Sequence, residues 1–427
     1  MKVLIVGGGG REHAIALKIK ENPEVTALYA APGNGGIAQI ATCLPFKATD
    51  VDGIVRWAAE NKVDFVIVAP DDPLCLGMVD ALAAQGIPAF GPRKNAAIIE
   101  GSKVFSKNLM KKYGIPTAAY ETFDDYDAAV KHLQTADMPI VVKADGLALG
   151  KGVLICPDRE SAVEAVASMM KEAKFGASGA RVVIEEFLTG PEVSVLAFTD
   201  GKTVKPMVSS MDHKRALDHD EGLNTGGMGT IAPNPCYTPE LAQRCMDEIF
   251  LPTIAAMNAE GRTFTGCLYF GLMMTPKGPK VIEYNCRFGD PETQVVLPLL
   301  KSDLLTIMRA TVDGTLADTP VEFASGAACC VVLASGGYPV SYKSGYPISG
   351  LDEAGKTATV FHAGTKLVDG QIVTAGGRVL GVTATADTLE AAIDKAYQAA
   401  DKITFTDMHM RRDIGQRALA SRKESHS

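Results

Sequence analysis

The chain has 427 residues, of which 47% are hydrophobic and 22% charged, and its formal net charge is −8. This composition is typical of a globular protein and excludes a mainly disordered or collagen-like chain. At about 150 residues per domain, the length predicts roughly three domains. The chain lacks the basic surplus of most nucleic-acid-binding proteins, and no apolar run approaches the about 20 residues that span a bilayer. We therefore expect no nucleic-acid or membrane partner.

The N-terminus and the cysteines both indicate a cytoplasmic protein. Only the apolar residues Val3–Val6 precede the first glycines, which is too short a core for a signal peptide. Nine cysteines without a Cys-x-x-Cys pair argue against both a disulfide framework and a structural zinc site.

The first hundred residues alternate short apolar runs with amphipathic stretches. The expected strands are Val3–Val6, Val25–Ala30, Phe65–Val68 and Ile87–Phe90, and the expected helices are Arg11–Glu21, Asp52–Asn61 and Leu74–Gln85. Alternating β and α units with short connections predict a doubly wound parallel sheet with helices on both faces. A further helix is expected to begin at Pro92 and to run toward Lys112.

From about Tyr120 the strands come closer together, which indicates an α+β lobe. Its expected elements are the helices Asp124–Ala136 and Arg159–Lys174 and the strands Ile140–Lys143, Val153–Cys156 and Val182–Phe187. Strands dominate from Glu192 to Asn285, with one long helix that begins at Thr238-Pro239. After about Phe323 we expect a small α+β domain with the strands Cys329–Leu333, Thr357–His362 and Val379–Thr385 and the helix Leu389–Ile403.

The turn Gly7-Gly8-Gly9-Gly10 lies between the first strand and the first helix. Bare glycines there let a phosphate approach the backbone N–H groups of a helix N-terminus. The turn fails the dinucleotide fingerprint, because the third glycine would fall on Glu12 and no ribose-binding acid follows the second strand. We favour a phosphate-bearing ligand other than NAD, and a tight turn without a ligand is the alternative.

A second glycine-rich loop, Lys143–Gly152, joins two predicted strands. It differs from a Walker A loop, because only three residues separate Gly146 from Gly150 and Gly152 replaces the magnesium-binding Ser or Thr. A glycine hairpin with lysines at both ends suits a flap that closes over a polyphosphate. A solvated hairpin with incidental lysines is an equally good interpretation of this loop taken alone.

The stretch Val281–Glu292 carries the strongest signal for a metal. If strand alternation continues to its end, Glu283, Asn285 and Arg287 share one face, and the other face carries Ile282, Tyr284 and Cys286. A carboxylate and an amide oxygen about 7 Å apart along a strand can hold hard cations against phosphates. Arg287 adds a fork for a carboxylate or phosphate. An exposed polar strand face is the alternative.

Three further segments are candidates for ligand contacts. Glu192 follows a strand that ends in acids and a sharp turn, and it could accept hydrogen bonds from ribose hydroxyls. The segments Ser209–Arg215 and Asn224–Gly229 are unusually polar and glycine-rich, although ordinary solvated loops would look the same. The sequence shows no Ser-His-Asp arrangement and no context for a nucleophilic cysteine. Taken together, these motifs are typical of residues that bind phosphates, and none of them indicates a covalent nucleophile.

Taken in order, these motifs closely resemble the phosphoribosylamine–glycine ligase family of the ATP-grasp superfamily. The matching segments are 9–13, 32–34, 143–152, 185–188, 212–215, 224–229, 285–292, 361–365 and 376–379. The resemblance implies an N-terminal α/β domain at 1–101, an ATP-grasp A lobe at 102–120 and 191–323, a mobile B lobe at 121–190 and a C-terminal domain at 324–427. It implies that ATP, glycine and 5-phosphoribosylamine give glycinamide ribonucleotide, ADP and phosphate through glycyl phosphate, in purine biosynthesis, by a monomer.

The resemblance also assigns residues to each ligand. For ATP these are Lys103, Lys143, Gly150, Lys151, Gly152, Glu185, Glu186, Phe187, Leu188 and Glu192. For Mg²⁺ or Mn²⁺ they are Glu283 and Asn285. For glycine and phosphoribosylamine they are Gly9, Gly10, Asn34, Asp71, Asp212, Lys214, Gly226, Gly227 and Arg287. Lys143, Asp212 and Arg287 would act in catalysis.

The chain departs from the family pattern at three positions, and two rival functions stay open. Gly8, Asp71 and Leu149 stand where the pattern has Asn, Glu and Ala. One rival is another ATP-grasp ligase, such as a biotin-dependent carboxylase subunit, although the sequence has no Met-Lys-Met biotin signature. The other is a non-catalytic nucleotide sensor, which would not need to retain the metal pair.

Overall fold

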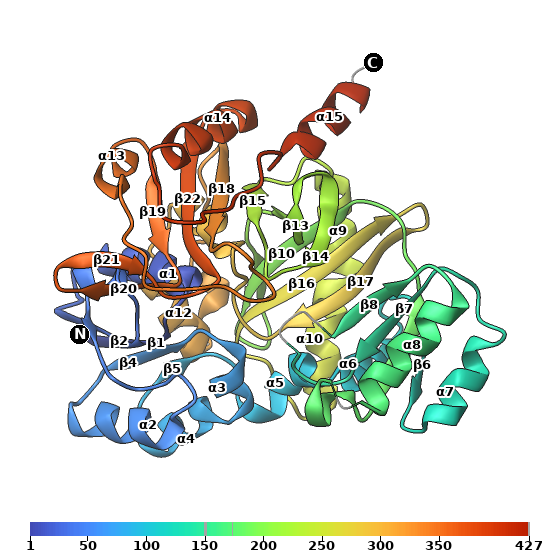
Figure 1. Cartoon of the computed structure of the whole chain (residues 1–427). Helices are drawn as coiled ribbons and strands as arrows, with labels where there is room; N and C mark the ends of the chain where they lie inside the picture. Colours follow the sequence, from blue (N-terminus) through green and yellow to red (C-terminus); the bar gives the residue numbers. More distant parts are fainter. Residues whose placement is uncertain (149–151, 173, 426–427) are drawn as a thin grey trace.

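Residues 1–90 form a five-stranded parallel sheet in the order β3-β2-β1-β4-β5 (Figure 1). The computed structural model describes residues 1–148, 152–172 and 174–425, with side chains up to residue 422. The strands are β1 Lys2–Gly7, β2 Ala27–Pro32, β3 Thr42–Cys43, β4 Phe65–Val68 and β5 Ala89–Phe90. The central strands β1 and β4 are almost fully buried, as expected for a parallel sheet covered on both faces. The predicted doubly wound domain is confirmed.

Two helices that were predicted as continuous are broken. Helices α1 Gly10–Lys20 and α2 Val51–Glu60 follow the prediction, but Leu74–Gln85 is divided between α3 Asp71–Cys75 and α4 Met78–Ala84. The break lies at Gly77, whose φ of +88° suits glycine. The helix from Pro92 is divided into α5 Lys94–Gly101 and α6 Lys103–Tyr113. Ser102 between them has an extended backbone, and its side chain caps α6 by accepting from Phe105 N.

A separate four-stranded antiparallel sheet, β6-β9-β7-β8, forms the lobe at the right of Figure 1. Its elements are β6 Tyr120–Phe123, α7 Tyr126–Leu133, β7 Ile140–Ala144, β8 Val153–Cys156, α8 Arg159–Met170 and β9 Val182–Glu186. The two helices pack together and close a core of their own with the sheet. The predicted glycine loop does connect two antiparallel strands, β7 and β8.

The central sheet, β11-β10-β16-β17, is antiparallel and carries the strongest candidate motif at its end. Its strands are β10 Glu192–Thr199, β11 Val204–Pro206, β16 Gly266–Thr275 and β17 Gly278–Asn285. The long helix expected from Thr238 consists of α9 Pro239–Cys245, a π-helical turn at Met246–Phe250 and α10 Leu251–Ala259. These residues cover one face of the sheet, and α12 Leu304–Asp313 covers the other.

The C-terminal unit shares its sheet with an earlier part of the chain. The order β12-β15-β18-β22-β19 joins β12 Met211–Asp212 and β15 Gly229–Ala232 to β18 Ala327–Ala334, β19 Thr359–His362 and β22 Arg378–Ala386. Helix α14 Leu389–Ala400 packs on β18 and β22. A boundary at residue 323 therefore runs through a sheet, and Asp212 lies on the edge strand of that sheet.

The remaining elements are short. They are the hairpins β13 Arg215–Leu217 with β14 Glu221–Asn224 and β20 Thr365–Val368 with β21 Gln371–Thr374, the helices α11 Thr293–Val296, α13 Leu351–Gly355 and α15 Gln416–Ser425, and 3-10 turns at Ile37–Gln39, Gly176–Gly179, Asp218–Asp220, Leu297–Leu299 and Leu316–Asp318. None of the helices in the described ranges has the length and hydropathy to cross a bilayer. All nine cysteines are free thiols.

Two buried histidines join the N-terminal domain to the C-terminal unit. His362 N donates to His13 Nδ1 at 2.8 Å, and the two rings meet edge to face. Burial lowers the pKa of His362 to about 4, and burial together with the neighbouring His362 lowers the pKa of His13 to about 3. Both imidazoles are therefore neutral in the folded protein at pH 5.

We predict that acidification destabilises the fold through these two histidines. A histidine of the unfolded chain titrates near 6.5, so the unfolded state binds more protons as the pH falls below that value. The free energy of unfolding should fall by about 2 kcal/mol for each histidine between pH 7 and pH 5. Chemical denaturation of the wild type and of His362→Gln at both pH values checks this. The same pH dependence in both proteins would contradict the assignment.

Candidate active site

The glycine turn before α1 packs against the segment that follows β17. Gly9 N donates to Glu12 Oε2 at 2.8 Å, so the Glu12 side chain reaches back to the N-cap backbone of α1. Arg11 N donates to Asp290 Oδ2 at 3.3 Å, and Arg11 Nη1 donates to Phe288 O at 3.0 Å. The N-terminal turn and the Asn285–Glu292 motif therefore contact each other directly.

Two glycines of this turn have no room for a side chain. A Cβ at Gly8 would lie 2.4 Å from the Gly33 carbonyl oxygen, and a Cβ at Gly10 would lie 2.5 Å from Gln294 Nε2. Close backbone approach thus accounts for glycine at position 8, one of the departures from the family pattern. The substrate contacts expected of Gly9 and Gly10 stay predictions.

The side chain of Asn34 is committed to the protein itself. Its amide nitrogen donates to the carbonyl oxygens of Gly8 and His362 at 3.0 and 2.7 Å, and its oxygen accepts from the N–H groups of Gly36 and Ile37. All of its hydrogen-bonding capacity is used. The structure therefore gives Asn34 the role of fixing the glycine turn, and gives no support to the expected contact with a substrate.

A buried carboxylate lies between two buried lysines. Glu185 Oε1 lies 2.5 Å from Lys143 Nζ, and Glu185 Oε2 lies 3.0 Å from Lys107 Nζ, all three side chains being at most 6% exposed. Lys143 also donates to Ile282 O at 3.2 Å. Burial lowers the pKa of Lys107 to about 8, against the opposing effect of Glu185. The Glu185 carboxylate thus holds both lysines in place, and its expected contact with ATP stays a prediction.

The residues that follow Glu185 differ in exposure and contacts. Glu186 accepts from Ala119 N at 3.1 Å, Phe187 and Leu188 follow β9 and are partly buried, and Glu192 is exposed. A cavity of about 330 Å³ adjoins Glu192 and is lined by Gly190, Pro191, Met211, Cys236, Arg417 and Ser421.

The base of the glycine loop is firmly held. Asp145 accepts from Ser102 Oγ and Val104 N at 2.9 Å and pairs with Arg181 at 2.6 Å. Lys103 Nζ donates to Gly146 O at 2.9 Å. Gly152 is buried, and the expected ATP ligands Gly150 and Lys151, like the departure Leu149, lie outside the described residues.

A bulge in β17 changes the face that one residue occupies. The register shifts between Val281 and Glu283, so Val281, Tyr284 and Cys286 enter one core whereas Ile282 does not. The prediction that Ile282 shares a face with Tyr284 and Cys286 is therefore wrong. Glu283 Oε1 lies 3.5 Å from Lys214 Nζ. Burial alone would raise the pKa of Glu283, but Lys214, Lys143 and Lys103 lower it, so the carboxylate is anionic.

Arg287 is paired with a carboxylate that the sequence did not suggest. Its Nη2 lies 2.8 Å from Glu100 Oε1, its Nη1 donates to Phe288 O at 3.4 Å, and its buried Nε has no hydrogen-bond partner among the described residues. Burial alone would lower the pKa of Arg287, but the nearby carboxylates of Glu100 and Asp71 raise it above its usual value. Asp71, which begins α3, is itself kept anionic by Arg287 and Arg11 despite its burial.

Asp212 and Glu292 form a second acidic region beyond β17. Asp212 Oδ1 accepts from His213 N at 2.8 Å, and Glu292 Oε1 accepts from Tyr269 Oη at 3.2 Å. Burial and then mutual repulsion with Glu292 raise the pKa of Asp212 well above its usual value. Gly227, at a φ of +124°, passes so close that a Cβ would lie 2.7 Å from Asp212 Oδ1. The Gly226 carbonyl accepts from Arg378 Nη1 at 2.9 Å.

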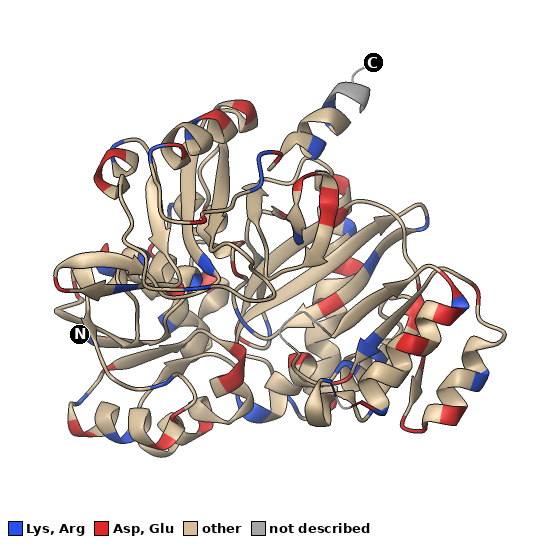
Figure 2. Cartoon of the chain, in the orientation of Figure 1, with Lys and Arg blue, Asp and Glu red and all other residues tan. Residues whose placement is uncertain are grey.

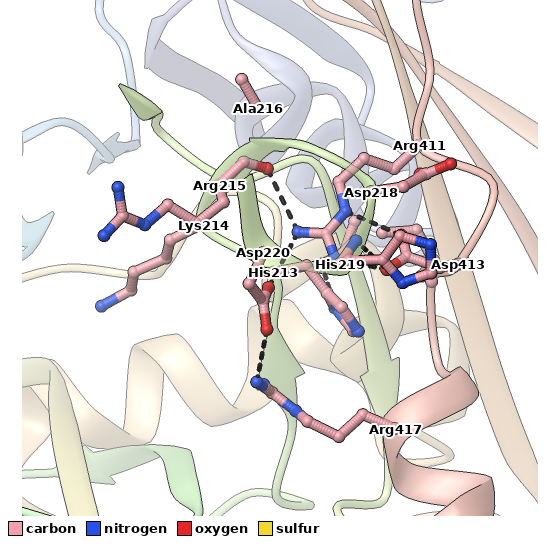
Figure 3. A network of polar contacts seen from close by, with 12 residues as sticks. His213, Lys214, Arg215, Ala216, Asp218, His219, Asp220, Arg411, Asp413 and Arg417 are labelled. Carbon is pink, nitrogen blue, oxygen red and sulfur yellow. Dashed lines mark hydrogen bonds and ion pairs between the residues drawn. The ribbon is translucent and has the colours of Figure 1, made fainter. Parts of the chain in front are cut away.

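The C-terminal segment holds the residues that flank Asp212 (Figure 3). His213 Nε2 accepts from Gly415 N at 3.1 Å, which fixes the residue between Asp212 and Lys214. Arg411, only 1% exposed, donates to Arg215 O and pairs with Asp220 and Asp413. Lys214 then reaches Glu283 and, at 3.9 Å, Glu192.

Sequence reasoning missed five charged residues of the site. They are Glu100, Lys107, Arg11, Glu292 and Arg378. Figure 2 shows acidic and basic residues interspersed along the outer helices, so a charge in an amphipathic helix does not mark a site by itself. The only available signal was that Arg11, Glu292 and Arg378 belong to the quoted motifs.

Three family models together match most of the chain. They describe the N domain, the ATP-grasp (A) domain and the C domain of phosphoribosylglycinamide synthetase, and they match residues 1–100, 101–293 and 328–417. The chain belongs to the phosphoribosylglycinamide synthetase family. Curated relatives agree along the whole length: phosphoribosylamine–glycine ligase of Halalkalibacterium halodurans is 48% identical over 425 residues, covering 100% of this chain and 99% of the relative. The enzyme of Caldanaerobacter subterraneus is 48% identical over 414 residues, covering 97% and 99%.

Solved structures separate this family from the rival ligase. The crystal structure of phosphoribosylamine–glycine ligase from Thermotoga maritima has a TM-score of 0.86 at 34% identity and covers 97% of this chain and 100% of that chain. The biotin carboxylase domain of Hydrogenobacter thermophilus 2-oxoglutarate carboxylase has a TM-score of 0.72 at 18% identity, covering 96% and 91%. The second likeness shows a shared fold alone. The predicted multidomain fold and its family are confirmed, and the carboxylase alternative is set aside.

We predict that Arg411→Ala destabilises this member of the phosphoribosylglycinamide synthetase family by about 3 kcal/mol, because it leaves carboxylates around a buried position unpaired. Arg412→Ala is the matched control, since Arg412 is 56% exposed and pairs with Asp401 at the surface. The control should cost less than about 1 kcal/mol. Urea denaturation of both variants measures the difference. Equal losses would show that the Arg411 network does not hold the C-terminal segment in place.

Proposed function

We infer that the chain is an ATP-dependent ligase that joins glycine to 5-phosphoribosylamine, giving glycinamide ribonucleotide, ADP and phosphate in purine biosynthesis. The observation that carries this inference is the match to all three domains of one ligase family, with 48% identity along the full chain to named relatives. The buried lysines and the acidic end of β17 support it, because they supply the charges that phosphoryl transfer needs. A nucleotide sensor would not need the arrangement of Glu283, Asn285 and Arg287.

We propose that the reaction proceeds through glycyl phosphate. The glycine carboxylate attacks the γ-phosphate of ATP and releases ADP, and the amine of phosphoribosylamine then displaces phosphate from the acyl carbon. Lys103 and Lys143, at the base of the glycine loop, would neutralise the phosphates. Positioning and charge neutralisation carry such a reaction, so no enzyme nucleophile is required.

Glycine would be held between opposite charges on either side of β17. Arg287 has a buried Nε with no partner in the described part of the chain, which suits a carboxylate. Asp212, on the edge strand of the C-terminal sheet, would accept the glycine ammonium. The raised pKa of Asp212 follows from burial beside Glu292, and an incoming cation would relieve that repulsion.

The metal would be Mg²⁺ or Mn²⁺, held by Glu283 and Asn285. The donor set fits, because Glu283 is anionic and both residues offer oxygen to a hard cation. Residues 1–148, 152–172 and 174–425 contain no group of three His, Cys, Asp or Glu side chains that could hold a metal alone. Few protein ligands suit a cation that is shared with phosphates, where it would neutralise charge on the transferred group.

The proposed function predicts that ADP release requires both partners. With freshly made phosphoribosylamine, glycine and ATP, ADP should form at the same rate as glycinamide ribonucleotide, because the acyl phosphate is passed to the amine. Omission of glycine should abolish ADP release, since no nucleophile for the γ-phosphate remains. A coupled ADP assay with each substrate left out in turn measures this. ADP formation that ignores glycine would refute the ligase.

Glu283→Ala should abolish turnover while leaving the fold intact. Loss of an anionic oxygen ligand weakens metal binding, and we expect kcat/KM to fall at least about 10²-fold, or 2.7 kcal/mol. The matched control is Glu248→Ala, a carboxylate paired with Arg244 on the surface. Steady-state rates across a metal titration measure the effect. An unchanged metal dependence in Glu283→Ala would remove Glu283 from the metal site.

A further inference from the structure

One buried carboxylate contacts three consecutive residues of the β17 exit. Glu100 lies at the C-terminal end of α5 and is 8% exposed. Its Oε1 lies 2.8 Å from Arg287 Nη2, and the Asn285 amide, oriented so that its nitrogen faces acceptors, donates to the same Oε1 at 3.1 Å. Its Oε2 accepts from Cys286 N at 2.8 Å. Both carboxylate oxygens are therefore occupied by residues 285–287.

These contacts fix the orientation of the Asn285 amide. Oε1 already accepts from Arg287 Nη2, so it faces the Asn285 amide as an acceptor. The amide therefore turns its nitrogen toward Glu100 and toward the Tyr284 carbonyl oxygen, 3.2 Å away. The Asn285 oxygen then points away from Glu100. This is the orientation that a metal ligand needs, because a hard cation is bound by oxygen. Glu100 and the Tyr284 carbonyl oxygen thus select the same one of the two amide orientations.

The same carboxylate sets the position of the guanidinium. Glu100 takes Arg287 Nη2, the Phe288 carbonyl takes Nη1, and Nε is left without a partner among the residues described. Cys286, between Asn285 and Arg287 in the chain, donates its backbone N–H to Glu100, so the backbone of this segment is tied to the same carboxylate. Ile99 and Cys286 also belong to one apolar core, so α5 is packed against this segment beyond the polar contacts.

We propose that Glu100 is a positioning residue that fixes Asn285 and Arg287 in one frame, so that the metal and glycine subsites are set together. The proposal rests on the proposed function for the identity of the two ligands. Glu100 touches neither substrate. It acts through Asn285, whose oxygen it directs, and through Arg287, whose charge and direction it sets.

Glu100→Gln is the decisive variant because it preserves size while adding a donor. The glutamine NH₂ must face either Cys286 N or, at the position of Oε1, both Arg287 Nη2 and Asn285. In the second case Arg287 loses its acceptor, and Asn285 can adapt by turning its oxygen toward Gln. That rotation removes the metal ligand. We expect a roughly tenfold weaker Mg²⁺-dependent gain in ADP affinity by calorimetry, and a roughly tenfold higher KM for glycine. Glu260→Gln is the matched control, since Glu260 also takes two donors, Lys112 and Tyr113, far along the chain from these motifs.

The two measurements distinguish positioning from a general structural role. A merely structural Glu100 would lower kcat with the folded fraction and leave KM for glycine and the Mg²⁺ dependence unchanged; that result overturns the proposal. If Glu100→Gln does not fold, Glu100→Asp takes its place, with the charge kept but the reach to all three partners lost, and the same two shifts are expected. Normal constants in Glu100→Asp would also overturn it.

A double-mutant cycle with Arg287→Lys completes the test. If Glu100 acts on glycine through Arg287, the KM for glycine should rise much less when Glu100→Gln is added to Arg287→Lys than when it is added to the wild type. Fully additive effects would overturn that route. The calorimetric arm does not depend on turnover. A wild type without glycine-dependent ADP release would therefore refute the proposed function, while a weakened Mg²⁺ dependence in Glu100→Gln would still support the positioning of Asn285.

Discussion

The site depends on the pairing of charges that burial would otherwise make prohibitive. Removing an ion from water costs several kcal/mol even after relaxation, so a buried lysine or carboxylate persists only against an opposite charge with its hydrogen bonds satisfied. Glu185 has the opposite charges of Lys143 and Lys107 beside it, and Glu100 has that of Arg287. The Nε of Arg287 is left without a hydrogen-bond partner among the described residues. Each pair fixes the side chains in one geometry before any substrate arrives. Preorganised charges of this kind are what phosphoryl transfer requires.

Three structural units meet at the exit of β17 because of the same constraint. The N-terminal domain contributes Arg11, and the following helix α5 contributes Glu100. The C-terminal sheet contributes Arg378, whose Nη1 donates to Asp290 O at 2.9 Å. Glu100 and Arg378 have partners in another unit, Arg287 and Asp290, whereas Arg11 also pairs with Glu12 of its own helix. Docking of the units therefore completes the pairing of Glu100 and Arg378.

The sequence predicted what depends on local patterns and missed what depends on distant partners. The buried strands β1 and β4 and the glycine hairpin between β7 and β8 follow from apolar runs and turn residues, and they were predicted correctly. The bulge at Ile282 and the break at Ser102 were not predicted. The bulge is a register shift of β17 against its partner strand β16, and the break is the residue that caps α6. Strand β12 has only two residues, too few for any periodicity.

Glu100 and Asn34 show what motif reasoning leaves out: the contacts that a residue makes within the protein. Glu100 lies in a helix whose pattern gives no reason to separate it from solvated acids, yet its carboxylate faces three residues almost 190 positions away. Asn34 belongs to a quoted motif, yet all of its hydrogen bonds go to the turn it supports. A motif marks residues that the fold constrains, and the constraint can be a substrate or another part of the chain. The count of free donors and acceptors bears on that choice: Asn34 has none left, whereas Arg287 keeps a buried Nε without a partner among the described residues.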